Sequence, residues 1–382
     1  MNTLGAHVRD LWRLDPGFLT VNHGSFGATP LAVLAEQQAW RDRMEAQPSR
    51  FMRTVLPGAL RAAAERLAGF IGARGDDVVF VDNATGGCNA VLRSLRLRAE
   101  QEVLVLSHGY GAVRNTVRFV TERAGARMIE AVIPFPRPTE DAVVDAVAAA
   151  LTPETRLAVI DHITSASALV LPVARIAALC HERGVPVLVD GAHAAGQIDL
   201  DVPATGADWY IGNCHKWLCA PKGSAFLWSA PARQVGLHPT IISHGFEQGY
   251  LAEFDWTGTR DFSAMLSVPA AIEFHERLGG LALRQRNRAL ALAATRLLAD
   301  RLGTEAGADP SMMAAMGLVR LPGPPDRVGP LRDHLLAAGT DAPVHVLDGA
   351  IWLRLSAFAY NDVNDYERLA ELLAGIRWGE LA

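Results

Sequence analysis

The sequence predicts an α/β protein with a large domain around a mostly parallel central sheet and a smaller C-terminal α+β domain. Its 382 residues are 50% apolar, which is enough to bury a sizeable core and to form more than one domain. From about residue 57 to 228, helical segments alternate with short runs rich in Val, Ile and Leu. Strands buried on both faces of a parallel sheet have this continuously apolar pattern. After residue 260 the order of elements changes, which indicates a second domain.

The large domain is predicted from helices and apolar runs that follow one another at short intervals. The predicted helices cover residues 58–71, 87–97, 111–124, 140–151 and 173–183. The predicted strands cover residues 78–81, 103–106, 128–133, 157–160, 185–189 and 225–228. Gly, Pro or polar residues bound the runs, as expected for short buried strands. Functional residues should then cluster where strands end and helices begin.

The second domain follows a segment, residues 236–260, in which the regular pattern loosens. The elements predicted after it are two long helices at 263–278 and 281–302, a strand at 317–321, a helix at 328–338, a strand at 351–358 and a helix at 363–373. The expected organisation is an N-terminal arm (1–20) packed on the small domain, a large domain (21–255) and a small domain (256–382).

Composition and charge favour a cytosolic protein that acts on small molecules. The net charge is −5 without a basic block, which argues against nucleic acid as a partner. No apolar stretch reaches the roughly 18 residues of a membrane span, and the first residues do not resemble a signal peptide. The four cysteines show neither CxxC nor zinc spacing, so reduced thiols and no metal are expected.

Lysine is scarce in this chain, and its two occurrences are Lys216 and Lys222. Since 34 of the 36 basic residues are arginine, a lysine after an apolar run indicates amine chemistry, which an arginine cannot perform. An arginine-biased composition with two remaining surface lysines is the alternative.

A candidate constellation surrounds Lys216. The predicted strand 185–189 leads into Asp190, and an acid at the end of a buried strand needs a cationic partner. A carboxylate that keeps a pyridine nitrogen protonated and an amine that forms an imine are what pyridoxal phosphate (PLP) requires. Taken alone, Asp190 could be a helix cap and His193 a core histidine.

The third requirement of PLP is a phosphate site, and residues 78–87 provide a strand, a small-residue turn and a helix start. Free backbone N–H groups and the helix dipole favour a dianion there, and the Thr85 hydroxyl adds a donor. Such turns are common, so the signal is weak alone. The full GxGxxG fingerprint is missing, which disfavours a nicotinamide cofactor.

Several phrases of the chain resemble the class V aminotransferase family of PLP enzymes, and most closely its isopenicillin N epimerase-like branch. The phrases are residues 19–27, 190–193, 213–223 and 254–261. The likeness covers nearly the whole chain and implies the fold of the type I PLP-dependent transferases.

The resemblance implies a role for each matching residue of the cofactor site. Lys216 would form the Schiff base and move protons at the substrate α-carbon. Asp190 would pair with the pyridine nitrogen, and His193 and Ser165 would approach the phenolic oxygen. The phosphate would be bound by Ala84, Thr85, Gly86, Asn213 and His215, with Thr259 of the second subunit of a homodimer. Either Tyr110 or His108 would stack on the ring.

The resemblance also implies a substrate side. Arg354, the one charge in an apolar strand, would bind the α-carboxylate, for which its bidentate geometry is suited. Asn22 and His23 would line this side. Arg50 could receive an acidic distal group, and Arg260 would lie near the second subunit.

The resemblance does not name one reaction. It leaves epimerisation, transamination and carbon–sulfur β-elimination of the ergothioneine-pathway kind open, with a non-catalytic binding module as the alternative from another class. Cysteine desulfurases of the family use a mobile cysteine shortly before the carboxylate-binding arginine. Residues 342–348 contain none, so sulfur transfer is not expected.

Overall fold

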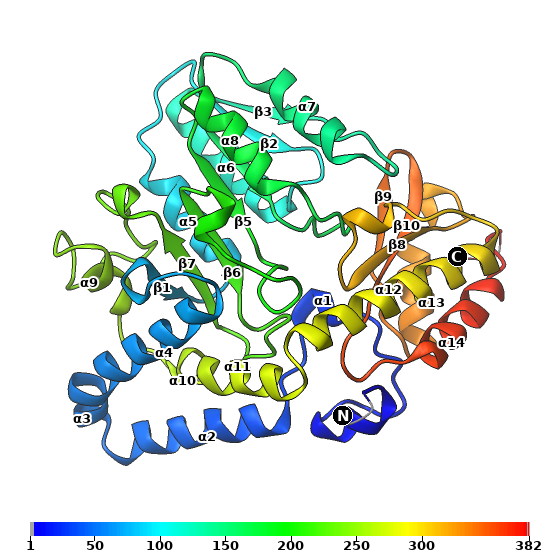
Figure 1. Cartoon of the computed structure of the whole chain (residues 1–382), viewed down its shortest axis with the longest axis horizontal. Helices are drawn as coiled ribbons and strands as arrows, with labels where there is room; N and C mark the ends of the chain where they lie inside the picture. The colour runs from blue at the N-terminus through cyan, green and yellow to red at the C-terminus, as the bar shows by residue number, and fades with distance from the viewer. Residues whose placement is uncertain (1–3, 380, 382) are drawn as a thin grey trace.

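A computed structural model describes residues 4–379 and 381 of the chain. Its central feature is a seven-stranded sheet in the order β1-β7-β6-β5-β4-β2-β3 (Figure 1). The strands are β1 (Val78–Val81), β2 (Glu102–Leu106), β3 (Arg127–Ala131), β4 (Thr155–Asp161), β5 (Val187–Asp190), β6 (Trp209–Asn213) and β7 (Ala225–Ser229). Neighbours from β3 to β6 are parallel, and β7 runs antiparallel to both β6 and β1. The predicted α/β class is therefore confirmed.

Helices cover both faces of this sheet. Those of the first 255 residues are α1 (His23–Phe26), α2 (Leu31–Ala46), α3 (Pro48–Arg50), α4 (Leu56–Phe70), α5 (Ala84–Ser94), α6 (Gly111–Ala124), α7 (Glu140–Ala150), α8 (Val173–Glu182) and α9 (Tyr250–Asp255). The start of α5 is fixed by its sequence, because the Asn83 side chain caps it and accepts a hydrogen bond from the Gly86 N–H at 2.9 Å.

The chain then forms a smaller three-stranded antiparallel sheet in the order β8-β10-β9. The remaining elements are α10 (Ser263–Leu266), α11 (Val268–Arg277), α12 (Leu281–Leu302), β8 (Met316–Arg320), α13 (Val328–Ala337), β9 (Val344–Leu347), β10 (Ala350–Ser356) and α14 (Val363–Ala374). Helices α12 and α14 pack on each other, and a separate apolar cluster lies between them and the sheet. Figure 1 shows this unit beside the large sheet.

The domain boundaries proposed from the sequence stay predictions, but the contacts of the flanking segments are informative. Helices α10 and α11 belong to the segment 256–382 that was predicted as the small domain. They pack, however, on α2 and α4 of the segment predicted as the large domain. In the N-terminal arm, Arg9 forms an ion pair with Asp365 of α14 at 3.1 Å. Trp12 packs edge-on against Phe274 of α11 and Phe358 beyond β10. The arm thus joins α11 to the smaller unit.

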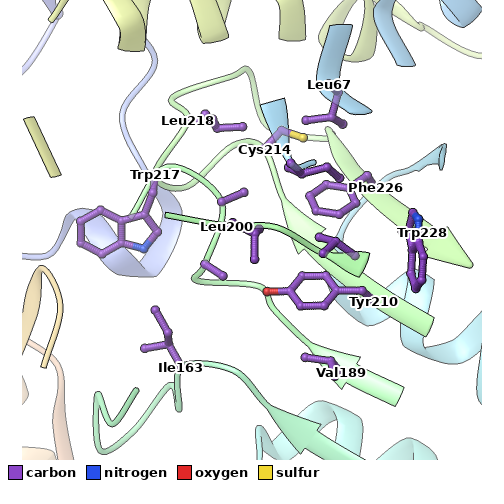
Figure 2. Packing of buried hydrophobic residues seen from close by; sticks show 14 of the residues in the cluster. Leu67, Ile163, Val189, Leu200, Tyr210, Cys214, Trp217, Leu218, Phe226 and Trp228 are labelled. Atoms are coloured by element: carbon purple, nitrogen blue, oxygen red, sulfur yellow. The ribbon is translucent and has the colours of Figure 1, made fainter. Parts of the chain in front are cut away.

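The large-domain core continues to the edge of the sheet where the functional residues lie. Figure 2 shows Tyr210 and Phe226, from the paired strands β6 and β7, and their rings are stacked with centroids 6.2 Å apart. Trp217, in the loop between these strands, is fully buried. This loop is therefore anchored in the core.

Within the described part of the chain, no helix is long and apolar enough to cross a membrane, and no cluster of His, Cys, Asp or Glu could hold a metal ion. The cytosolic location stays a prediction.

Candidate active site

Nine of the seventeen predicted site residues line one cavity of about 370 Å³ at the carboxyl ends of the parallel strands. It lies where β4, β5 and β6 end, beside the first turn of α5. The lining residues are Ser25, Phe26, Asn83, Ala84, Thr85, Tyr110, Asp161, Ile163, Ser165, Asp190, Ala192, His193, Asn213, His215 and Lys216. Ligand sites of open α/β sheets occupy this position.

Lys216 lies in the loop between β6 and β7, and its Nζ is 3.1 Å from Nε2 of His193. Burial, followed by the positive charge of Arg354, lowers the pKa of the amine to about 8, while the charge of Asp190 opposes the shift. A lysine with this pKa is partly unprotonated near neutral pH, so it can act as a nucleophile and as a base.

His193 stays neutral beside this amine. Burial, followed by the charges of Lys216 and Arg354, holds its pKa well below the usual value. The indole N–H of Trp217 donates to Nδ1 of His193 at 3.4 Å. The hydrogen of the neutral ring is then on Nε2, which donates to the unprotonated amine of Lys216. The arrangement therefore favours the reactive form of the lysine.

The N-terminal segment holds the backbone of Lys216 in place. Nε2 of His23 lies 3.0 Å from the Lys216 carbonyl oxygen, and Nδ1 lies 2.9 Å from the Tyr360 hydroxyl. Because the carbonyl only accepts, Nε2 carries the hydrogen and Nδ1 accepts from the tyrosine. A Cβ at Gly27 would lie 2.0 Å from the carbonyl oxygen of His215, so the two segments are in direct backbone contact.

Two carboxylates lie side by side on the cavity wall. Asp190 ends β5, Asp161 ends β4, and the parallel register places them opposite each other. Each is only 4% exposed. Burial raises the pKa of both groups, and the charge of Asp190 raises the pKa of Asp161 further. In the described residues, Asp190 accepts one hydrogen bond, from the Ala192 N–H at 3.0 Å, and has no ion-pair partner.

The first turn of α5 offers fewer free donors than the sequence indicates. The Ala84 N–H donates to the Asn213 side chain at 2.9 Å, and the Gly86 N–H donates to that of Asn83. The N–H and hydroxyl of Thr85 have no hydrogen-bond partner among the residues described. These two groups lie in the first turn of α5, where the helix dipole attracts anions.

Arg354 of β10 is 2% exposed and has no ion pair with a carboxylate in the described chain. Its terminal nitrogens donate to the Ser165 carbonyl oxygen at 2.6 Å, the Ser25 hydroxyl at 2.8 Å and the Asn22 side chain at 3.1 Å. Nε is buried without a partner. A buried guanidinium with neutral partners and an unused N–H favours binding of an anion beside the cavity.

Comparison with protein families gives this geometry a context. Residues 27–316 match the family model Aminotransferase class-V. The chain belongs to this family.

Relatives within the class V aminotransferase family differ in their named activities. Isopenicillin N epimerase of Amycolatopsis lactamdurans is 36% identical over 392 residues, covering 97% of this chain and 98% of the relative. L-cysteine desulfhydrase of Arabidopsis thaliana is 32% identical over 396 residues, covering 94% of this chain and 87% of the relative. The desulfhydrase relatives do not fit well with the expectation that a cysteine desulfurase is unlikely.

Solved structures show the same fold. C-DES, in a variant with glycine covalently linked to its PLP cofactor, superposes with a TM-score of 0.80 at 22% identity. The match covers 94% of this chain and 97% of C-DES. The predicted type I fold of PLP enzymes is thus confirmed.

The class V family and the PLP-bound neighbour indicate pyridoxal 5′-phosphate as the cofactor, and the cavity suits it. It contains a lysine of lowered pKa, a carboxylate without a cation, and free donors at a helix N-terminus. Lys216, Asp190 and Thr85 would hold the aldehyde carbon, the ring nitrogen and the phosphate in turn.

Eight of the residues predicted for this class V site are not among those that line the cavity: Asn22, His23, Arg50, Gly86, His108, Thr259, Arg260 and Arg354. Nδ1 of His108 lies 2.8 Å from the Ser167 hydroxyl, whereas Tyr110 lines the cavity; which of the two stacks on a ring stays a prediction. His23 lies behind Lys216, where both ring nitrogens are engaged. Arg50 is exposed at the end of α3, away from the cavity wall.

The residues expected to reach a second subunit lie on the surface. Thr259 is exposed, and Arg260 forms an ion pair with Asp82 at the end of β1. Their roles, and the homodimer, stay predictions.

Sequence reasoning missed several residues of the class V cavity. Ser25 and Phe26 of α1 and Asn83, Asp161, Ile163 and Ala192 line it without having been named. A signal existed for Asp161, because it ends an apolar strand as Asp190 does.

Proposed function

We propose that this enzyme is a PLP-dependent carbon–sulfur β-lyase that acts on L-cysteine or a small related amino acid. One observation carries this proposal: the cavity contains a single amine of lowered pKa, Lys216, and beside it lies a buried guanidinium without a carboxylate partner in the described chain, Arg354, which donates to the cavity-lining residues Ser25 and Ser165. Together they suit an α-amino acid whose α-proton is removed by one base. When bound, PLP supplies a sink for the electrons left at the α-carbon.

Arg354, Lys216 and His193 have different roles in the proposed reaction. The guanidinium of Arg354 binds the α-carboxylate and fixes the orientation of the substrate. The Nζ of Lys216 takes the proton from the α-carbon and later returns a proton, while neutral His193 holds the amine in place. For L-cysteine and one water the balanced products are sulfide, pyruvate and ammonia.

The cysteines support release of sulfide instead of its transfer to the protein. All four, Cys88, Cys180, Cys214 and Cys219, are buried, and none lines the cavity. Burial raises the pKa of each thiol, which disfavours the nucleophilic thiolate. A persulfide-forming desulfurase is therefore not proposed.

The decisive experiment gives the PLP-loaded enzyme L-cysteine and measures sulfide and pyruvate. Equal amounts of both are expected, with activity lost in Lys216→Ala. Pyruvate formation by the Lys216→Ala enzyme at the unsubstituted rate would refute the role of the lysine. Absence of any product from a panel of amino acids would favour a non-catalytic module.

Epimerisation is the second candidate, because the epimerase relative aligns over almost the full length of both chains. Inversion needs a second proton donor, and the Tyr110 hydroxyl is the candidate on the cavity wall. Tyr110→Phe should then abolish formation of the inverted isomer in D₂O while leaving β-elimination active. Chiral chromatography and mass spectrometry measure the two outcomes.

We also propose that the active enzyme is a homodimer. Thr259 is exposed, and Ile241 and Ile242 are large apolar side chains more than half exposed; Ile241 lines a surface hollow together with Arg260 and residues of β1. Light scattering tests the assembly.

A further inference from the structure

A buried acid without an assigned role lies next to the carboxylate expected to meet the cofactor. Asp161 and Asp190 are opposite residues of the hydrogen-bonded parallel strands β4 and β5, so their side chains point to the same face and line the same cavity. Each is 4% exposed, and neither forms an ion pair in the described residues. Two such carboxylates cannot both be ionised at low cost.

We propose that Asp161 and Asp190 form one acid pair with a single shared proton, and that Asp161 is a positioning residue which orients Asp190 toward the ring nitrogen of the cofactor. In this arrangement the protonated carboxyl of Asp161 donates to the carboxylate of Asp190. The pair then carries one negative charge, which matches the one positive charge of a protonated ring nitrogen. The inference depends on the proposed role of Asp190.

The surroundings place the proton on Asp161 and the charge on Asp190. Asp190 faces the positive charge of Lys216, which lowers its pKa, whereas the Asp190 charge raises the pKa of Asp161. The backbone N–H of Tyr110 also meets the Asp161 carboxyl, which fixes its position. Titratable or charged groups face the pair from each adjoining element: Cys88 of α5, Arg114 of α6, Tyr210 of β6 and Lys216 of the loop after it.

Arg114, whose positive charge lowers the pKa of Asp161, is already engaged. Arg114 forms an ion pair with Glu130 at 2.5 Å and donates to the Leu106 carbonyl oxygen at 2.6 Å. Its charge lowers the pKa of Asp161 less than burial and Asp190 raise it. Cys88 and Tyr210 carry raised pKa values and stay neutral beside the pair. Proton sharing is thus the remaining way to compensate two buried acids.

The first test uses the apoprotein and needs no turnover. Infrared difference spectra between the unsubstituted protein and Asp161→Asn should show the band of a protonated carboxylic acid that is missing in the variant at neutral pH. Asp199→Asn, which removes an exposed acid, is the control and should leave the band in place. If the unsubstituted protein has no such band, the proposal is wrong.

The second test measures PLP affinity by absorbance titration. Asp161→Asn keeps a donor to Asp190, so its Kd should stay within about threefold of the unsubstituted protein, whereas Asp161→Ala loses the hydrogen bond and should bind about tenfold more weakly. Equal Kd values for the two variants would overturn the positioning role. Neither test uses product formation, so the inference can hold even if the proposed lyase reaction fails.

Discussion

Lys216 owes its chemistry to where its side chain is buried. Since burial is the largest cause of its lowered pKa, the amine is reactive without a dedicated base beside it. An arginine at this position would remain protonated, because its guanidinium does not lose a proton in proteins. The scarcity of lysine in the sequence therefore drew attention to a residue whose reactivity depends on the burial of its amine.

This pKa predicts the pH dependence of PLP capture. The amine attacks only when unprotonated, so the rate of covalent PLP binding to the apoprotein should rise as the pH increases toward 8 and level off above it. Stopped-flow absorbance measures this rate. Lys216→Arg should show no covalent capture at any pH, and a rate independent of pH in the unsubstituted protein would contradict the assignment.

Arg354 is expected to act in substrate binding. Arg354→Gln should raise KM for L-cysteine by roughly 100-fold, about 3 kcal/mol, because a buried charge pair loses one partner. Arg354→Lys keeps the positive charge but loses the bidentate guanidinium geometry. Its KM should therefore lie between those of the unsubstituted protein and Arg354→Gln. Steady-state sulfide release measures KM. Arg50→Gln is the control: a neutral substrate has no acidic group for Arg50, so an equal rise there would argue against a specific role for Arg354.

At the scale of elements, the apolar runs of the parallel strands made most of the large sheet predictable. Strand β6 and the short edge strand β9, with a polar residue in its middle, were not named as strands. Asp161 was missed as a site residue because its position opposite Asp190 depends on the register between β4 and β5. That register cannot be derived from the sequence of either strand alone. Ser25 and Phe26 reach the cavity only because the chain folds back to the loop after β6, a contact more than 180 residues apart in sequence.

The contact between the N-terminal segment and the Lys216 loop gives a stability prediction. Gly27 has φ 66° and ψ 164°, a region that only glycine occupies readily, and a Cβ there would clash with the His215 carbonyl oxygen. Gly27→Ala should therefore lower the free energy of unfolding by about 3 kcal/mol.

A matched glycine provides the control for this prediction. Gly58 is exposed in α4 with open space around its Cβ position, so Gly58→Ala should raise stability by about 0.5–1 kcal/mol. Urea denaturation measures both variants. Similar effects of the two substitutions would show that the backbone contact at Gly27 does not constrain the fold.

At the scale of the whole molecule, several neutral histidines are buried in the fold. Burial lowers the pKa of His23 to about 3 and those of His162 and His275 to about 4 from the usual 6.5. Between these values the unfolded chain binds more protons than the folded chain, so stability is complete above pH 6.5 and falls as the pH drops toward 4. Each group contributes a slope of about 1.4 kcal/mol per pH unit.

His275 allows this slope to be tested away from the site. Its Nε2 lies 3.2 Å from the Gly196 carbonyl oxygen, and the amide of a glutamine could donate there instead. His275→Gln should reduce the acid slope by about 1.4 kcal/mol per pH unit in urea titrations between pH 4 and 6.5. His334→Gln, at an exposed position, is the control, and an unchanged slope in the His275 variant would count against the assignment.

The indole of Trp217 follows Lys216 directly in the chain and is fully shielded from water, with its N–H on His193. An aromatic fluorophore held this rigidly within bonding distance of the cavity wall is a built-in optical reporter. Its emission would be quenched by energy transfer to a chromophore on the neighbouring amine whose absorbance overlaps that emission. Loading of the protein could thus be followed in real time without a label.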